Sequence, residues 1–253
     1  MNRLTGIKSQ QVDNGWRNVT GEKGQNMFLR TVRFVFRIVL NIIARVDIEG
    51  YGNVPKTGGA IVVTNHIGRL DALLGVILAD RDDFILMVAE KYKNVPLWRW
   101  TGKKVDAVWL DRYEADFNTL RVVLRRLKKG EILGMAPEGT RSESEALVQG
   151  KPGAAYLAAK AKVPIIAVGL TGTEDRVVKY RLRHFRRLDI SIKIGEPFYL
   201  PPMDRKNRDA FLEQSTEEIM CRIAALLPPD HRGVYADAPR LQEILAAQPA
   251  VTA

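Results

Sequence analysis

One short stretch of the sequence, VVTNHIGRLDALL at residues 62–74, places two side chains suited to acid–base chemistry close together. The chain has only three histidines, and one of them, His66, ends an apolar run that is followed five residues later by Asp71. On one straight helix five residues turn through about 140°, so the two side chains would not meet there. They can meet if His66 lies in a strand-to-helix turn and Asp71 lies in the first helical turn.

Such a contact would make the pair an acid–base site. Asp71 would accept a hydrogen bond from one ring nitrogen and fix the tautomer, which leaves the other nitrogen of His66 as a base. The alternative interpretation is a helix-capping residue followed by an unrelated surface aspartate.

A second group of polar residues, APEGTRS at 136–142, also follows an apolar run. Gly139 would let the backbone approach a ligand closely, and the planar guanidinium of Arg141 suits a phosphate. Glu138 could accept a hydrogen bond from a hydroxyl group. Taken by itself, the segment is equally typical of a charged surface turn.

A third candidate stands in WLDR, residues 109–112, where a charged pair ends another apolar run. Arg112 could bind a phosphate as a charged, fork-shaped donor. Alternatively, it forms an ion pair with Asp111 at the edge of a sheet.

The elements that must position these residues alternate between strands and helices. Apolar or alternating runs predict strands at 45–50, 60–65, 83–90, 107–112, 131–137, 163–172 and 189–198. Periodic segments predict helices at 70–80, 115–129, 153–162 and 205–227. This order predicts an α/β fold: one domain with a mixed, mostly parallel sheet, helices on both faces and an amphipathic helix in front. His66, Arg112 and Glu138 each fall at a predicted strand end, where α/β proteins usually place their sites.

The composition limits the kinds of partner. A net charge of +10 favours an anionic partner, such as a phospholipid surface, a nucleic acid or a phosphorylated substrate. The single cysteine, Cys221, cannot form an internal disulfide and is best explained as a small buried residue. The three histidines are scattered without ligand spacing, so no metal is expected.

The N-terminal part of the chain predicts a helix at residues 28–45 that lies on a membrane surface. Its arginines recur at spacings of three and four, opposite an apolar face to which Phe34 is the one clear exception. The proposed membrane contacts are Arg30, Arg33, Arg37, Arg45, Phe28 and Phe36. The arginines argue against a span, and the alternative is an ordinary helix packed on the sheet. Around it we expect a flexible arm at 1–27, the main domain at 46–227 and a C-terminal tail at 228–253.

Four segments taken in order resemble the glycerolipid acyltransferase family, which includes the 1-acylglycerol-3-phosphate acyltransferases. They are NHIGRLD at 65–71, VWLDR at 108–112, APEGTRS at 136–142 and VPIIAV at 163–168, and the resemblance covers about residues 50–200. Ala136 stands where the family has phenylalanine and Ala167 where it usually has a second proline. We expected both departures to lie near the acceptor pocket.

The resemblance implies an acyltransferase in which His66 is the general base and Asp71 its orienting partner. His66 would deprotonate the free hydroxyl of lysophosphatidic acid, which attacks an acyl thioester of CoA or acyl carrier protein and gives phosphatidic acid for phospholipid synthesis. Neither a cofactor nor a nucleic acid is implied, and the place of action is the cytoplasmic face of a membrane, with peripheral or monotopic attachment. The implied substrate-binding residues are Asn65, Arg112, Glu138, Gly139, Thr140 and Arg141, with Lys103 and Lys104 as weaker phosphate candidates.

Two other functions remain open at this point. The departures from the family pattern favour transfer to another lipid acceptor, such as a lysophospholipid or an amino- or sugar-lipid. The positive charge alone would also suit a non-catalytic basic module on a membrane. The basic run at 176–187 is either a solvated face or a platform for lipid phosphates or an acidic acyl carrier protein. Tryptophans within 95–104 suit either a membrane interface or a core.

Overall fold

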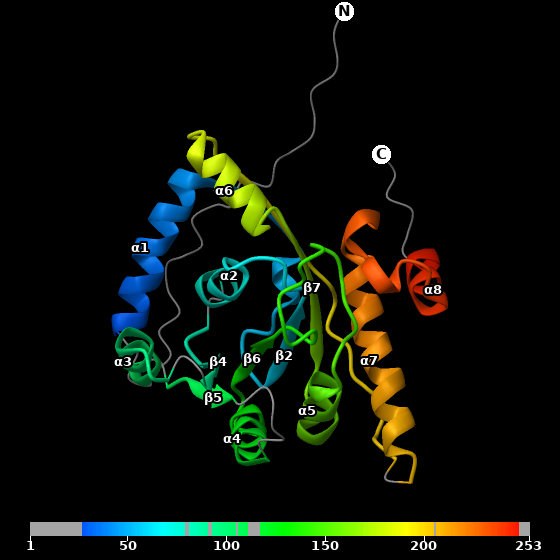
Figure 1. Cartoon of the computed structure of the whole chain (residues 1–253). Coiled ribbons are helices and arrows are strands. Elements are labelled where there is room, and N and C mark those ends of the chain that lie inside the picture. The colour runs from blue at the N-terminus through cyan, green and yellow to red at the C-terminus, as the bar shows by residue number, and fades with distance from the viewer. Residues whose placement is uncertain are drawn as a thin grey trace, which may run out of the picture.

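A six-stranded sheet forms the centre of the computed structural model, which describes residues 27–78, 81–90, 93–104, 106–110, 117–204 and 206–247 (Figure 1). The strand order is β1-β8-β7-β2-β6-β3, and only the β7–β8 pair is antiparallel. The strands are β1 Ala44–Glu49, β2 Ala60–Thr64, β3 Phe84–Ile85, β6 Ile132–Met135, β7 Ile165–Thr171 and β8 Leu188–Ile194. The predicted mixed, mostly parallel sheet is confirmed.

Helices cover both faces of this sheet, as predicted (Figure 1). One face packs against α4 Phe117–Lys128, α5 Gly153–Ala161, α7 Arg208–Ala225 and α8 Pro239–Ala247. The other face packs against α1 Met27–Ile43, α2 Asp71–Leu78 and α6 Asp175–Arg183. The remaining helices are α3 Pro96–Lys104 and the short 3₁₀ helices Tyr51–Asn53, Pro229–His231 and Gly233–Tyr235.

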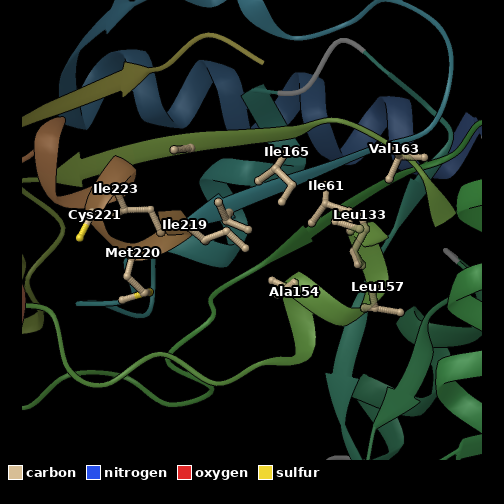
Figure 2. Packing of buried hydrophobic residues seen from close by; sticks show 14 of the residues in the cluster. Ile61, Leu133, Ala154, Leu157, Val163, Ile165, Ile219, Met220, Cys221 and Ile223 are labelled. Atoms are coloured by element: carbon tan, nitrogen blue, oxygen red, sulfur yellow. The ribbon is translucent and has the colours of Figure 1, made fainter. Parts of the chain in front are cut away.

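The larger core lies between the central strands and the helices α5 and α7. Figure 2 shows Ile61, Leu133 and Ile165, one from each of β2, β6 and β7, close to residues of these helices. Cys221 is fully buried in the same cluster, and burial raises the pKa of its thiol to about 11. It is therefore a protonated core residue, as expected.

The central position of β2 decides where the site can form. β2 pairs in parallel with both β6 and β7, so that Val63 lies opposite Met135 on one side and Ala167 on the other. The carboxyl ends of the three strands therefore meet at one edge of the sheet. The segments that follow them begin at residues 65, 136 and 172.

The predicted strand at 83–90 is two strands in two sheets. β3 pairs with β6, whereas β4 Met87–Ala89 pairs with β5 Val108–Leu110 in a separate two-stranded sheet. The chain leaves the main sheet at Leu86, whose carbonyl accepts the N–H of Val108. The strand predicted at 107–112 thus ends at Leu110 outside the main sheet, and Arg112 lies outside the described residues.

The segment predicted as a C-terminal tail packs against the domain as far as Ala247. Leu241 of α8 is fully buried in the core, and the Tyr235 hydroxyl accepts the N–H of Gly150 at 3.0 Å. Its last residues, 248–253, and residues 1–26 of the arm predicted at 1–27 lie outside the described residues, whereas Met27 begins α1. A domain boundary at residue 227 would cut through this packing.

The side chains of the N-terminal helix α1 that are buried differ from those predicted. Arg33, expected at lipid headgroups, is only 6% exposed, pairs with Asp82 and donates to the carbonyl of Arg81 at 2.6 Å. Phe36 is partly buried against the second core. The helix ends before Arg45, because Arg45 belongs to β1. Its Nη1 lies 3.7 Å from Oδ1 of Asp189. The side chain of Phe28 is outside the described part of the structure.

Candidate active site

The site begins where β2 ends, with His66 in the connection to α2 and Asp71 as the first residue of that helix. The structure brings the two into contact, with His66 Nδ1 2.9 Å from Asp71 Oδ2. The ring is partly exposed, at 20% of its side-chain area, whereas the carboxylate is almost fully buried. Because Nδ1 faces the carboxylate, Nε2 is the nitrogen left to accept a proton.

Three further donors hold the Asp71 carboxylate. Oδ2 accepts the backbone N–H groups of Ile67 and Gly68, each at 2.8 Å. Oδ1 accepts the hydroxyl of Thr173 at 2.6 Å, and this threonine is completely buried. A Cβ on Gly68 would lie 1.8 Å from the Thr173 carbonyl oxygen, so only glycine allows this approach. Asp71 is thus locked in place before any substrate binds.

Asn65 has a structural role instead of the predicted substrate contact. Its side chain donates to the carbonyl of Leu170 and accepts the N–H of the same residue, both at 2.8 Å. The residue is 1% exposed. Its buried amide therefore ties the end of β2 to β7 and is not exposed to a ligand.

The loop at 136–142 forms hydrogen bonds with both the N–H and the carbonyl of His66. Glu138 accepts the N–H of His66 at 2.8 Å and that of Val148 at 3.1 Å, while the N–H of Ser142 donates to the His66 carbonyl at 2.8 Å. Burial raises the pKa of the Glu138 carboxyl. We predicted that Glu138 binds substrate, but its carboxylate is 2% exposed and already occupied, so it positions His66 instead.

The outer part of this loop is open to solvent and carries positive charge. Gly139 adopts φ 72°, which glycine tolerates best, and a Cβ there would lie 3.1 Å from the side chain of Lys151. Thr140 is exposed. Arg141 is half-exposed and pairs with Asp175 at 3.0 Å. Arg141 on the loop and Lys151 next to Gly139 are therefore cations near the His66–Asp71 pair, which we call the dyad.

The other predicted phosphate ligands lie elsewhere or are not described. Lys103 is exposed near the end of α3, and Lys104 is the last residue of that helix. Among the described contacts, none joins Lys103 to His66 or Asp71, and the side chain of Lys104 lies outside the described part of the structure. Arg112 falls in the segment 111–116, which is outside the described residues.

Sequence reasoning missed two residues of this site, Thr173 and Lys151. Thr173 follows the end of β7, the neighbour of β2, so the rule that parallel strands share a carboxyl edge could have pointed to it. Lys151 precedes α5 directly behind the loop, and only the path of the chain brings it over Gly139.

Comparison with known proteins places this geometry in a family. A sequence model described as acyltransferase matches residues 45–171, a span that contains the dyad and the loop at 136–142. The chain belongs to the acyltransferase family. Related proteins are named 1-acyl-sn-glycerol-3-phosphate acyltransferases, in agreement with the family that the motifs resemble.

Three relatives carry the same name. The 1-acyl-sn-glycerol-3-phosphate acyltransferase of Bacillus subtilis (strain 168) is 25% identical over 194 residues, covering 75% of this chain and 92% of that protein. The alpha form from Mus musculus is 29% identical, covering 63% of this chain and 54% of that protein. A chloroplastic form from Arabidopsis thaliana is 31% identical, covering 51% and 36%. The chain thus spans nearly all of the bacterial relative and about half or less of the other two.

A solved structure has the same fold. The crystal structure of the 1-acyl-sn-glycerophosphate (LPA) acyltransferase from Thermotoga maritima matches with a TM-score of 0.57 and 23% identity, covering 76% of this chain and 78% of that chain. At this identity the likeness is evidence for the fold and not for the substrate. The acyltransferase fold therefore agrees with the family assignment from the sequence model.

Proposed function

We propose that this acyltransferase moves a fatty acyl group from an acyl thioester, of CoA or acyl carrier protein, to the free hydroxyl of 1-acylglycerol-3-phosphate. The product is phosphatidic acid. The observation that carries the proposal is the His66–Asp71 contact at the end of β2, next to the loop at 136–142 with Arg141 on its outer side. The names of the relatives, 1-acyl-sn-glycerol-3-phosphate acyltransferases, support the choice of acceptor.

The chemistry needs no covalent acyl-enzyme. Nε2 of His66 removes the proton of the acceptor hydroxyl as its oxygen attacks the thioester carbonyl. The tetrahedral intermediate collapses, the C–S bond breaks, and the proton passes to the departing thiolate. The negative charge of Asp71 stabilises the imidazolium that exists between these two proton transfers.

A phosphate on the acceptor would meet Arg141 at the rim of the site. Arg141 now shares the exposed carboxylate of Asp175 with Arg69, whose backbone N–H donates to it at 3.0 Å. Such an exposed ion pair contributes little to stability, so a phosphate can replace Asp175 at low cost. The side chain of Lys151 over Gly139 supplies a second cation.

Replacing Arg141 by alanine should therefore weaken use of the phosphorylated acceptor. A lost charge-assisted contact costs about 1.5–3 kcal/mol, which is roughly ten- to a hundredfold in kcat/KM. We expect little change with monoacylglycerol, which has no phosphate. Arg121→Ala on α4, at an exposed position, is the control. Equal losses with both acceptors would show that Arg141 has a structural role.

The proposed function is tested by measuring thiol release from acyl-CoA with a panel of acceptors. Lysophosphatidic acid should be the best substrate, ahead of lysophosphatidylcholine, lysophosphatidylethanolamine and amino- or sugar-lipids. A clear preference for another lysolipid would overturn the choice of acceptor.

The two departures from the family pattern lie in different places. Ala167 is buried within β7 and does not line the site, contrary to our expectation. The carbonyl of Ala136 accepts the N–H of Gly139 inside the loop.

We also propose that α1 attaches the protein to the membrane surface that holds its substrates. Among the described residues, no helix is both long and apolar enough to cross a bilayer. The solvent-facing side of α1 is nevertheless apolar over several turns. Its exposed apolar residues are Met27, Val32, Phe34, Val35, Ile38, Val39 and Ile42, and Arg30, Thr31 and Asn41 are exposed on the same helix. Phe34, the exception in the sequence pattern, is thus part of the exposed surface that would enter the lipid.

Serine replacements at Phe34, Ile38 and Ile42 should detach the protein from vesicles. These residues are four apart and share one face, and none is buried in the core. We expect partitioning onto anionic vesicles to fall by about a hundredfold or more, measured by flotation. The matched control is the triple serine variant of Val122, Tyr199 and Val234, which are exposed on other elements. Unchanged flotation of the α1 variant would exclude this helix as the anchor.

A further inference from the structure

An exposed apolar ring lies at the end of α6, far from the catalytic residues in sequence. Phe185 is 100% exposed and adopts φ 52°, a conformation that a bulky residue rarely takes. Hydrogen bonds fix the turn around it, because the N–H of Phe185 donates to Leu182 and that of Arg186 donates to Arg181. The turn therefore presents the ring to solvent by construction.

Exposed positive charge flanks Phe185 in the sequence. Lys179, Arg183 and Arg186 are exposed, and within the described residues no acidic side chain pairs with them. Neighbouring arginines behave differently. Arg176 pairs with Glu145, and Arg181 pairs with Asp189. We call residues 179–187 the basic tip.

The basic tip is attached to the proposed membrane helix. Arg187 donates to the carbonyl of Asn41 and, at 2.7 Å, to that of Ala44, at the C-terminal end of α1. Figure 1 shows α6 next to this end of α1, with α4 at the opposite end of the molecule. The apolar surface of α1 and the basic tip therefore share one edge of the protein.

We infer that the basic tip is a second lipid-binding site, in which Phe185 enters the bilayer interface while Lys179, Arg183 and Arg186 contact the phosphates of anionic lipids. This inference rests on the proposed function, which requires the enzyme to work at a membrane. An exposed apolar ring on the same segment as three exposed cations matches the boundary between acyl chains and headgroups. An acidic carrier protein would pair with the cations, but it would need a pocket to bury Phe185.

A second contact would also orient the active site. A single helix lying flat leaves the protein free to rotate about the helix axis. From Arg183 in the tip, α6 runs for roughly 12 Å to Asp175, which pairs with Arg141 at the rim of the site. Anchoring both α1 and the tip would therefore hold the rim at a constant height above the lipid surface.

The first test places a polarity-sensitive dye at the tip. The only native cysteine, Cys221, is buried, so a Phe185→Cys variant can be labelled selectively. Adding vesicles of phosphatidylcholine and phosphatidylglycerol should shift the emission to the blue, and brominated lipids should quench it. Tyr199→Cys, at another exposed aromatic position, should show neither effect. If the protein binds vesicles without a change at position 185, the inference is wrong.

The second test removes the charges. Glutamine at Lys179, Arg183 and Arg186 should lower partitioning onto the anionic vesicles by about a hundredfold at low salt, because each of the three cations is worth roughly fivefold near such a surface. The control carries glutamine at Arg121, Arg125 and Lys128, exposed cations of α4 with the same total charge. Equal losses in the two variants would reduce the effect to net charge and overturn a specific tip.

Two further measurements separate this inference from its alternatives. A dye response to an acidic acyl carrier protein in lipid-free solution, without a response to vesicles, would make the tip a protein-docking surface and overturn the inference. Thiol release in detergent micelles should be unchanged in the tip variants, since none of these residues touches the dyad. If the unmodified enzyme releases no thiol with any acceptor, the proposed function fails, and the vesicle results then show whether the tip binds lipid independently.

Discussion

Replacing His66 by alanine is expected to lower the rate of thiol release by about 10²–10⁴, the contribution of a well-placed general base. The ring contacts Asp71 through Nδ1 and presents Nε2 as the only proton acceptor of the pair. Without it, the acceptor hydroxyl must lose its proton to water during the attack. The measurement is kcat with acyl-CoA and lysophosphatidic acid in detergent micelles.

The fold should survive this change, because the ring is partly exposed and Glu138 and Ser142 hold His66 through its backbone. Circular dichroism and the melting temperature check this point. His184→Ala, which removes an exposed histidine at the end of α6, should leave micellar activity unchanged. Near-normal turnover by a folded His66→Ala protein would refute base catalysis by this residue.

Asp71→Asn should lower kcat by at least about a hundredfold. The sequence predicts that this loss comes from a wrong tautomer of His66, whereas the structure gives a different explanation. The N–H groups of Ile67 and Gly68 both point at Oδ2, so they require the amide oxygen of asparagine at that position. The amide nitrogen would then face the Thr173 hydroxyl, which can act as an acceptor. The tautomer would be retained, and the loss would come from the missing negative charge beside the imidazolium.

Two measurements distinguish these explanations. Nitrogen NMR of the imidazole should show the proton still on Nδ1 of His66 in the asparagine variant, while kcat falls and KM changes little. Asp47→Asn, an exposed residue of β1, serves as the control for charge removal. A proton found on Nε2 would favour the tautomer explanation, and an unchanged kcat would remove Asp71 from the mechanism.

The sequence by itself determined the fold class, the family and the place of the site. Strand and helix periods are local properties of the chain, so the runs around residues 60–65, 131–137 and 163–172 predicted strands that the structure contains. Parallel strands share a carboxyl edge, and this rule predicts that residues 65–71 and 136–142 lie together. The order of the motifs added the acyltransferase chemistry.

Only the tertiary structure decided what each polar side chain does at that edge. Asn65 and Glu138 were predicted to bind substrate, but the first holds Leu170 and the second holds the backbone of His66. Thr173 entered the site unpredicted, through a contact that spans 102 residues of sequence. The same residue types would bind ligands equally well if they were free to do so.

The surface was decided in the same way. The helical period predicts Arg33 among the lipid-facing cations, but Arg33 is buried and pairs with Asp82. Phe34 is instead part of the exposed apolar face. In the sequence, Phe185 is one residue of the basic run at 176–187. In the structure, the turn after α6 leaves its side chain fully exposed. A sequence states which hydrogen bonds, charges and apolar areas a side chain can offer. Which of them are used inside the protein depends on partners that packing brings from distant parts of the chain, and only the remainder is left for substrate and membrane.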